Sequence, residues 1–151
     1  MAGNSRVERV HATSNGGGGI HLCVSSNDPV AEGCILRSSS AFRNGGQYAV
    51  RGGTETLVEG NTITYNAGTG IWLEASTALH NAVHFNQGSG ILAVAGLLIG
   101  NHVGNNSNYG IEFNGTFSGW RDNVLNANGT GAVNGSSTQL GVNVCVGAPC
   151  P

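Results

Sequence analysis

The sequence predicts an all-β protein built as a parallel β-solenoid, in which the short strands of successive coils stack along one axis. Three observations predict this fold: a repeated spelling with a period of about 20 residues, period-two alternation of apolar residues, and turn residues between the runs. The repeat is clearest in GNTITYNAGTGIWL, HNAVHFNQGSGILA and GNHVGNNSNYGIEF, which begin at Gly60, His80 and Gly100.

Four repeats place like residues at like offsets when they are aligned on their first Asn. The first Asn is Asn61, Asn81, Asn101 and Asn123; five positions later stand Asn66, Asn86, Asn106 and Asn128; ten positions later stand Ile71, Ile91, Ile111 and Val133. The frame continues more loosely upstream and gives about six coils, whose starts lie 20 to 27 residues apart. Helical repeats need about 33 residues or more, so this period excludes most of them.

Each repeat is interpreted as one turn of the solenoid. Ile71 and Leu73 alternate with Trp72, which is a strand pattern, and clusters of Gly and Asn bound the strands. Stacking at ~4.8 Å places like positions above one another, so the Ile and Val columns become interior ladders. We expect the inward Asn residues to adopt left-handed backbone geometry and to donate their amides to the Asn of the next coil. The Asn, Gly and Ile columns are therefore structural rather than a binding motif.

The pattern N-x-[IV]-x-x-N-x-x-x-G-I resembles the repeat of the pectate-lyase-like superfamily, over about residues 7–135. This resemblance implies an all-β, single-stranded right-handed parallel β-helix of about six coils. The terminal LGVNVCVGAPCP is similar to a segment of uncharacterised bacterial members, so we expect coils over residues 1–135 and a capping segment over 136–151. The resemblance says less about activity, because the fold hosts lyases, hydrolases, epimerases, phage tailspikes and non-catalytic proteins.

The composition excludes several classes of function. A net charge of -2 and a pI near 6.2 leave no basic footprint for nucleic acid. No run approaches 18 uninterrupted apolar residues, so no membrane span is predicted. The stretch Met1–Ser14 is polar and carries Arg6 and Arg9, which is unlike a signal peptide. No cofactor is predicted.

The four cysteines favour an exported or extracellular protein, and the superfamily resemblance favours a bacterial one. An even count in a small chain rich in Gly and Asn is typical of one or two disulfides, for which the candidate pairs are Cys145–Cys150 and Cys23–Cys34. The alternative is four free thiols in a cytosolic protein. The spacings lack the paired CxxC form of zinc sites.

The open ends of a solenoid need caps or partners. The first coil begins within about ten residues of Met1 with no amphipathic helix before it, so either the chain is the C-terminal part of a longer solenoid or a partner covers its first coil. Both alternatives predict an N-terminal edge that associates, and we expect a homo-oligomer. Leu92 and Val94 fall at outward strand positions, which makes them interface candidates. The alternative is that neighbouring loops cover them. A trimeric tailspike-like module is a further possibility.

Enzymes on this fold need clustered outward carboxylates, and the resemblance implies Asp/Glu pairs in hydrolases. Glu74 and Glu112 are the catalytic candidates because both point outward. They are two coils and two positions apart, which puts their Cα atoms ~12 Å from each other, with Leu92 and Val94 between them. Hydrolases need the two carboxyl groups ~5–10 Å apart, so we favour solvated surface carboxylates.

Two further groups of side chains are candidate ligand sites. His80, His84 and His102 gather near the fourth and fifth coils, but no cysteine or carboxylate lies in register to complete a metal site, so surface histidines are favoured. Tyr65 and Phe85 align at an outward turn, and with Trp72 they are candidates for a sugar-stacking platform. The alternative is that these rings stack across coils and stabilise the turn.

The leading functional hypothesis is a non-catalytic solenoid that binds or scaffolds a carbohydrate or cell-surface partner and self-associates. The alternative is a polysaccharide lyase or hydrolase, or its remnant, acting through residues such as Glu74 and Glu112.

Overall fold

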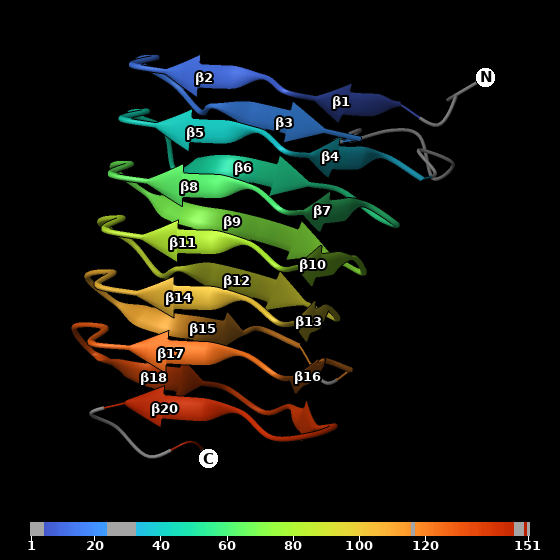
Figure 1. The fold of residues 1–151 in the computed structure, drawn as a ribbon, viewed down its shortest axis with the longest axis vertical. Coiled ribbons are helices and arrows are strands. Elements are labelled where there is room, and N and C mark those ends of the chain that lie inside the picture. The colour runs from blue at the N-terminus through green and yellow to red at the C-terminus, as the bar shows by residue number, and fades with distance from the viewer. Residues whose placement is uncertain (1–4, 24–32, 116, 147–149, 151) are drawn as a thin grey trace.

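The computed structural model describes residues 5–23, 33–115, 117–146 and 150. In this part of the chain three strands form each coil, and the strands of successive coils pair in parallel (Figure 1). The result is a prism of three sheets that share one interior. No helix of the described residues is long and apolar enough to cross a membrane.

The three sheets each take one strand from every coil. Sheet A holds β1 (Arg6–Glu8), β4 (Ile35–Arg37), β7 (Leu57–Glu59), β10 (Thr77–Leu79), β13 (Leu97–Ile99), β16 (Gly119–Arg121) and β19 (Thr138–Gln139). Sheet B holds β2 (His11–Thr13), β5 (Ser40–Phe42), β8 (Thr62–Thr64), β11 (Ala82–His84), β14 (His102–Gly104), β17 (Val124–Asn126) and β20 (Val144–Val146). Sheet C holds β3 (Ile20–Leu22), β6 (Tyr48–Gly52), β9 (Thr69–Glu74), β12 (Ile91–Val94), β15 (Tyr109–Phe113) and β18 (Gly131–Asn134). The predicted right-handed parallel β-helix of about six coils is confirmed.

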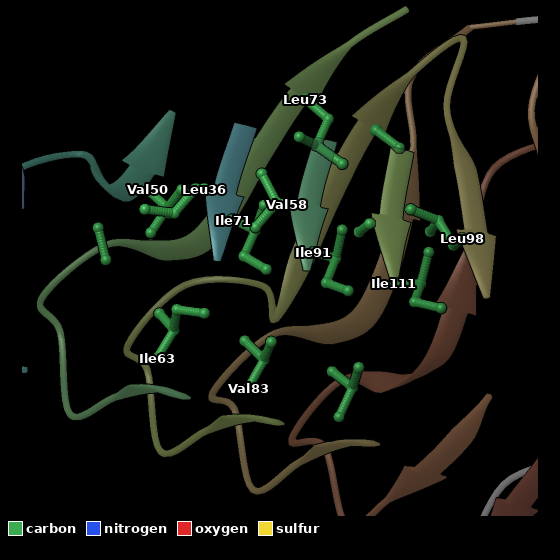
Figure 2. Close-up of a cluster of buried hydrophobic side chains, with 14 of the residues drawn as sticks. Leu36, Val50, Val58, Ile63, Ile71, Leu73, Val83, Ile91, Leu98 and Ile111 are labelled. Carbon is green, nitrogen blue, oxygen red and sulfur yellow. The ribbon is translucent and has the colours of Figure 1, made fainter. Parts of the chain in front are cut away.

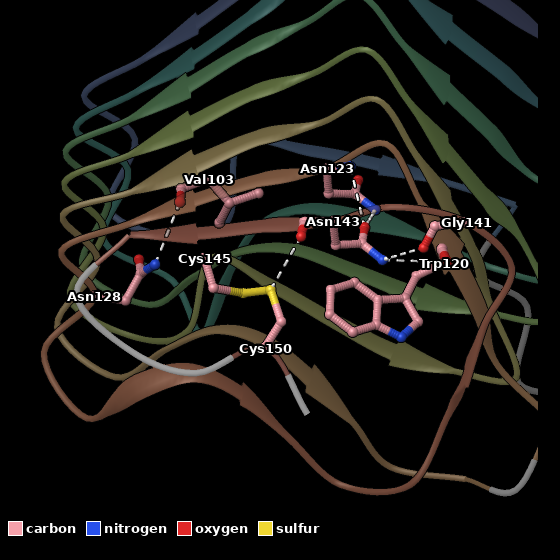
Figure 3. Close-up of a disulfide and its surroundings, with 8 residues drawn as sticks. All are labelled: Val103, Trp120, Asn123, Asn128, Gly141, Asn143, Cys145 and Cys150. Carbon is pink, nitrogen blue, oxygen red and sulfur yellow. Dashed lines mark hydrogen bonds between the residues drawn. A yellow bond between two sulfur atoms is a disulfide. The ribbon is translucent and has the colours of Figure 1, made fainter.

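The segment after residue 135 adds to the stack. β19 pairs with β16 and β20 pairs with β17, so the described part of this segment begins a seventh coil. The backbone N–H and the side-chain amide of Asn123 donate to Asn143 Oδ1 at 3.1 and 3.0 Å (Figure 3). The repeat therefore continues past residue 135 for at least two strands. That residues 136–151 act as a cap stays a prediction.

The four cysteines form two disulfides. Cys23 follows β3 and Cys34 precedes β4, so their bridge joins the end of the first coil to the start of the second. Cys145 lies in β20 and is bonded to Cys150 beside the last rung of the stack (Figure 3).

The core is a set of apolar columns, one from each sheet. In the three-residue strands β4, β7, β10 and β13 the middle residue is buried, and the residues on either side point outward. Figure 2 shows how the columns converge on one interior. The columns contain Leu36, Val58, Ala78, Leu98 and Trp120 from sheet A, Ile63, Val83, Val103 and Leu125 from sheet B, and Ile71, Ile91 and Ile111 from sheet C, all fully buried. Burial of each Val, Leu or Ile side chain stabilises the fold by about 1.5–3 kcal/mol.

Two ladders of Asn side chains, buried except at Asn15, Asn128 and Asn143, hold the corners of the coils together. One ladder runs through Asn61, Asn81, Asn101, Asn123 and Asn143. The other runs through Asn15, Asn44, Asn66, Asn86, Asn106 and Asn128. At the rung between Asn61 and Asn81, the backbone N–H and the side-chain amide of Asn61 donate to Asn81 Oδ1 at 3.0 and 3.1 Å. The amide of Asn81 also donates to the Val58 carbonyl at 2.8 Å, in the same coil as Asn61, and to Asn101 Oδ1 at 3.0 Å in the coil on the other side. Each Asn thus satisfies turn groups that would otherwise be buried without a partner.

The ladder Asn residues do not themselves adopt the left-handed geometry that the sequence suggested. Positive φ occurs instead at the residue before each of them except Asn143, as at Gly60 (63°), His80 (54°) and Tyr65 (59°). Positive φ falls at the preceding residue because one left-handed residue turns the backbone sharply at the corner. The side chain of the next residue, the ladder Asn, then points into the interior. The Asn can then keep ordinary backbone angles while its amide reaches both neighbouring coils.

Replacing a ladder Asn should destabilise the fold strongly. Asn86→Ala removes the acceptor of two Asn66 donors and two bonds that the Asn86 amide donates to Ile63 and Asn106. We expect a loss of about 2–4 kcal/mol in the free energy of unfolding, because buried polar groups lose their partners. Urea denaturation measures it. Asn126→Ala, at an exposed outward position of β17, is the control and should change stability by about 0.5 kcal/mol or less. Equal effects of the two changes would contradict the role given to the ladder.

Candidate functional site

An aromatic strip runs up the corner between sheets B and C, made of Phe42, Tyr65 and Phe85. The rings of Tyr65 and Phe85 are stacked, with centroids 4.9 Å apart and planes 10° from parallel. Phe42 meets the other side of Tyr65 edge-on, at 5.8 Å between centroids. Tyr65 and Phe85 are 53% and 45% exposed, so much of each ring faces solvent.

The turn does not require aromatic residues at these positions. Tyr65 and Phe85 each precede a ladder Asn and have positive φ, of 59° and 56°. The same corner position is occupied by Arg43, Asn105 and Ala127 in other coils, also with positive φ. Bulky side chains adopt this backbone region rarely and at some cost. The turn can therefore form without an aromatic ring, and the stack of Tyr65 on Phe85 is a feature of these two coils.

Cationic and hydrogen-bonding side chains border the aromatic strip. The Arg43 guanidinium lies over the Phe42 ring, 4.8 Å from its centroid. The His84 ring lies 6.3 Å from Phe85 and 4.6 Å from His102, the latter in an edge-to-face arrangement. Sequence analysis missed Phe42 and Arg43, because the longer loop before them obscures their alignment with Thr64 and Tyr65. The strip thus combines apolar ring surface with the Arg43 guanidinium, which can donate to hydroxyl or carboxylate oxygens.

His84 makes a hydrogen bond through one ring nitrogen, and its pKa is lowered from the ordinary value. Its Nδ1 lies 3.2 Å from the Gly104 carbonyl, which can only accept, so Nδ1 carries the proton and Nε2 is left as an acceptor. Burial lowers the pKa of His84, and the positive charge of His102 lowers it further. The bond to Gly104 favours the protonated ring and offsets part of this shift. His84 is therefore held neutral to lower pH than an exposed histidine.

The structure brings His84 and His102 together, whereas the His80 ring packs against Gly100. The residues described here contain no group of three or more His, Cys, Asp or Glu side chains that could hold a metal ion.

Trp72 lies on a different surface from Tyr65 and Phe85, so the structure separates the three proposed members of one platform. Trp72 points outward from the middle of β9 in sheet C. The centroid of its ring lies 5.7 Å from that of Tyr48. The Arg51 guanidinium lies over the Trp72 ring, 4.7 Å from its centroid. The reason is geometric: the turn after Tyr65 redirects the chain, and a residue in the following strand faces the next side of the prism.

The two candidate carboxylates share sheet C but do not form a pair in register. Glu112 lies above Leu92 and Trp72 in one column, while Glu74 is paired with Val94. This is the two-coil, two-residue offset that the sequence indicates, with the aliphatic side chains between. The Ser89 hydroxyl donates to Glu112 Oε2 at 2.8 Å, which fixes this carboxylate against its own sheet. Leu92 and Val94 point outward and are partly covered, and their role as an interface stays a prediction.

These observations define a parallel β-helix whose outer walls carry the candidate sites. The chain matches the family described as the right handed beta helix region over residues 2–145, and it belongs to that family. Among solved structures it is similar to a mutant of the periplasmic alginate epimerase AlgG, with 16% sequence identity and a TM-score of 0.52. The match covers 93% of this chain and 43% of that one, so the chain spans less than half of the epimerase. At this identity the likeness concerns the fold alone. No curated protein matches the sequence.

Stability should depend on pH through His84. Because its pKa is lowered on folding, the unfolded chain binds a proton more readily than the folded one below about pH 6.5. We expect the free energy of unfolding to fall as pH drops from about 6.5 to the folded pKa, and to be unaffected by His84 above that window. His84→Thr, which copies Thr64 of the coil below, should weaken this dependence in urea titrations at several pH values. His80→Asn serves as the control. An unchanged profile in His84→Thr would show that another group is responsible.

Proposed function

We propose that this β-helix is an exported, non-catalytic module that binds carbohydrate through the aromatic strip. The observation that carries the proposal is the stacked, half-exposed pair of Tyr65 and Phe85 on the outer wall. Exposed aromatic rings offer an apolar surface for the C–H faces of a sugar, and their polar neighbours provide the hydrogen bonds that orient it.

The strip is preorganised, which favours binding. Tyr65 and Phe85 directly precede Asn66 and Asn86, whose side chains are fixed in the second ladder by bonds of 2.8 to 3.1 Å. The rings therefore sit on a backbone that is already ordered before a ligand arrives, and little further ordering is needed. In the next coil Asn105 occupies the position of Phe85, so no third ring follows on that side. This leaves one face of Phe85 as the natural start of a sugar-binding surface.

The non-catalytic part of the proposal is supported by the carboxylates. Inverting glycosidases place two carboxyl groups ~6.5–9.5 Å apart and retaining enzymes ~5–5.5 Å apart. The register gives Glu74 and Glu112 a Cα separation of ~12 Å, with aliphatic side chains between them.

Export is supported by the two disulfides, since such bonds persist in oxidising compartments. The similar AlgG structure is that of a periplasmic protein, which agrees with this placement.

A second candidate function is a polysaccharide-acting enzyme, or its remnant, with its site on sheet C. The specific observation in its favour is that Arg51, Trp72 and Glu112 lie in one outward column of that face, with Arg51 against Trp72 and with Leu92 between Trp72 and Glu112. The similarity in fold to an alginate epimerase is in line with this candidate.

Removing the aromatic strip should abolish carbohydrate binding without unfolding the protein. The double variant Tyr65→Asn with Phe85→Asn copies Asn105 of the next coil and suits a left-handed backbone. Against the polysaccharide that the wild type binds best in a panel of neutral and acidic polymers, we expect affinity to fall about tenfold or more, as for loss of central aromatic contacts. Affinity electrophoresis followed by calorimetry measures the effect.

The matched control is Trp72→Thr, which leaves the aromatic strip intact. It places at position 72 the same residue that stands at the outward position Thr62 of β8. If the double variant still binds the polysaccharide and Trp72→Thr does not, the binding site lies on sheet C. Release of cleaved or epimerised products by the wild type would favour the enzyme. A double variant that binds normally but melts at lower temperature would mean that the rings only stabilise the turn.

A further inference from the structure

The outward face of sheet A is largely aliphatic at the middle of the prism. Each of the strands β4, β7, β10 and β13 has two residues whose side chains point outward. Five of these residues are aliphatic: Ile35, Leu57, Leu79, Leu97 and Ile99. Leu140, directly after β19, extends this surface, and Leu97 and Leu140 are 36% and 54% exposed. The corresponding outward residues in the middle of sheet B are small or polar, such as Thr62, Ala82 and Gly104. A flat aliphatic wall of this kind marks a contact surface.

One column of this face has a charge pattern that complements itself. In register along the stack it contains Glu59, Leu79, Ile99 and Arg121. Two aliphatic residues thus occupy the centre, with an acid one coil before them and a base one coil after them. The Arg121 side chain is 51% exposed, and its nearest ion-pair partner among the described residues is Asp122, at 3.7 Å. Glu59 is paired with Arg37 at 2.6 Å on its other side.

We propose that two copies of this chain pack sheet A against sheet A, with their solenoid axes antiparallel. The two-fold axis would lie in the interface, along the strand direction, between β10 and β13. This operation places each coil opposite a coil of the partner in reverse order. Leu79 then faces the partner's Ile99, and Glu59 faces the partner's Arg121, with every contact made twice, as in any isologous interface.

The second outward column fits the same arrangement. It contains Leu57, Thr77, Leu97 and Gly119 in register. Leu57 faces the partner's Gly119, over which the Leu140 side chain of that same copy lies, and Thr77 faces the partner's Leu97. This column therefore adds mainly aliphatic contacts, while the first column pairs aliphatic with aliphatic and acid with base. Both columns support an antiparallel second copy as the occupant of this face.

A parallel dimer is disfavoured by the same residues. A two-fold axis along the solenoid would exchange the two outward columns and bring coils of equal number together, so that Glu59 faces the partner's Leu57 and Arg121 the partner's Gly119. Neither charge then meets an opposite one, and the complementarity that favours association is lost. The face is also modest in size: seven strands span ~29 Å along the stack, and three residues span ~10 Å across it. Such an interface lies at the low end of known sizes, so association should depend on protein concentration.

Charge reversal tests this arrangement, with mass measured by analytical ultracentrifugation from micromolar to near-millimolar concentration. The wild type should form dimers as concentration rises. Glu59→Arg alone places two Arg–Arg contacts in the dimer, and Arg121→Glu alone places two Glu–Glu contacts. Each should weaken dimerisation about tenfold or more. An equimolar mixture of the two single variants should restore a dimer. In the mixed dimer the arginine introduced by Glu59→Arg faces the glutamate introduced by Arg121→Glu, and the unchanged Arg121 of one copy faces the unchanged Glu59 of the other.

Two controls separate this effect from damage to the fold. Arg43→Gln removes a cation at the corner between sheets B and C, away from sheet A, and should leave dimerisation near the wild-type level. Leu92→Ser changes an outward aliphatic residue on sheet C and should also have no effect, whereas Leu79→Ser at the centre of the interface should weaken the dimer. Circular dichroism confirms that every variant is folded. A wild type that stays monomeric, a trimer, or a mixture that fails to restore association would each overturn the proposal.

Discussion

The hydrogen bond from one Asn side chain to the Asn above it is the contact on which the rest of this structure depends. A corner of the coil leaves backbone N–H and C=O groups inside the prism, where water cannot reach them. Asn supplies one acceptor and two donors on a short side chain, so a single residue such as Asn81 satisfies an N–H and a carbonyl of the preceding coil and also donates to the Asn of the following coil. Ser76 and Ser118 play this part at the third corner, where their hydroxyls accept from the Thr56 and Gly96 N–H groups. Once these bonds hold the corners of successive coils in register, the strands between the corners pair in register as well. The Ile side chains of neighbouring coils then pack against one another in the interior.

The ladder also explains where function can reside. Every inward position is committed to a column, so substitution there is constrained by the coils on both sides. Outward positions carry no such constraint, which is why the corner before a ladder Asn can hold Tyr65 and Phe85 in one pair of coils and Asn105 in the next. The left-handed backbone at that corner projects the side chain into solvent from a rigid base. The same freedom allows one wall of the prism to be aliphatic and another polar.

The sequence predicts the interior well and the exterior poorly, for a physical reason. Columns such as Ile71, Ile91 and Ile111 recur because stacking forces like residues together, and a recurring letter is visible without a structure. The position of the left-handed residue was assigned one place too late, because Asn is the commoner residue in that conformation. Trp72 was grouped with Tyr65 because offsets along the chain do not show how sharply a corner turns. Arg51, Arg43 and the aliphatic wall of sheet A were missed because outward residues do not repeat and leave no period to detect.

Removal of one complete coil tests the central claim that stacking in register defines this fold. Deleting residues 81–100 joins His80 to Asn101, so that Asn61 meets Asn101 and every column keeps its partners, since the ladder spacing is 20 residues here. The account predicts a shorter protein with a β-sheet circular dichroism spectrum and a single cooperative unfolding transition, somewhat less stable by the loss of one coil interface. Deleting only residues 81–90 removes half a period and should prevent folding. A whole-coil deletion that unfolds the protein, or a half-coil deletion that leaves it folded, would contradict the claim.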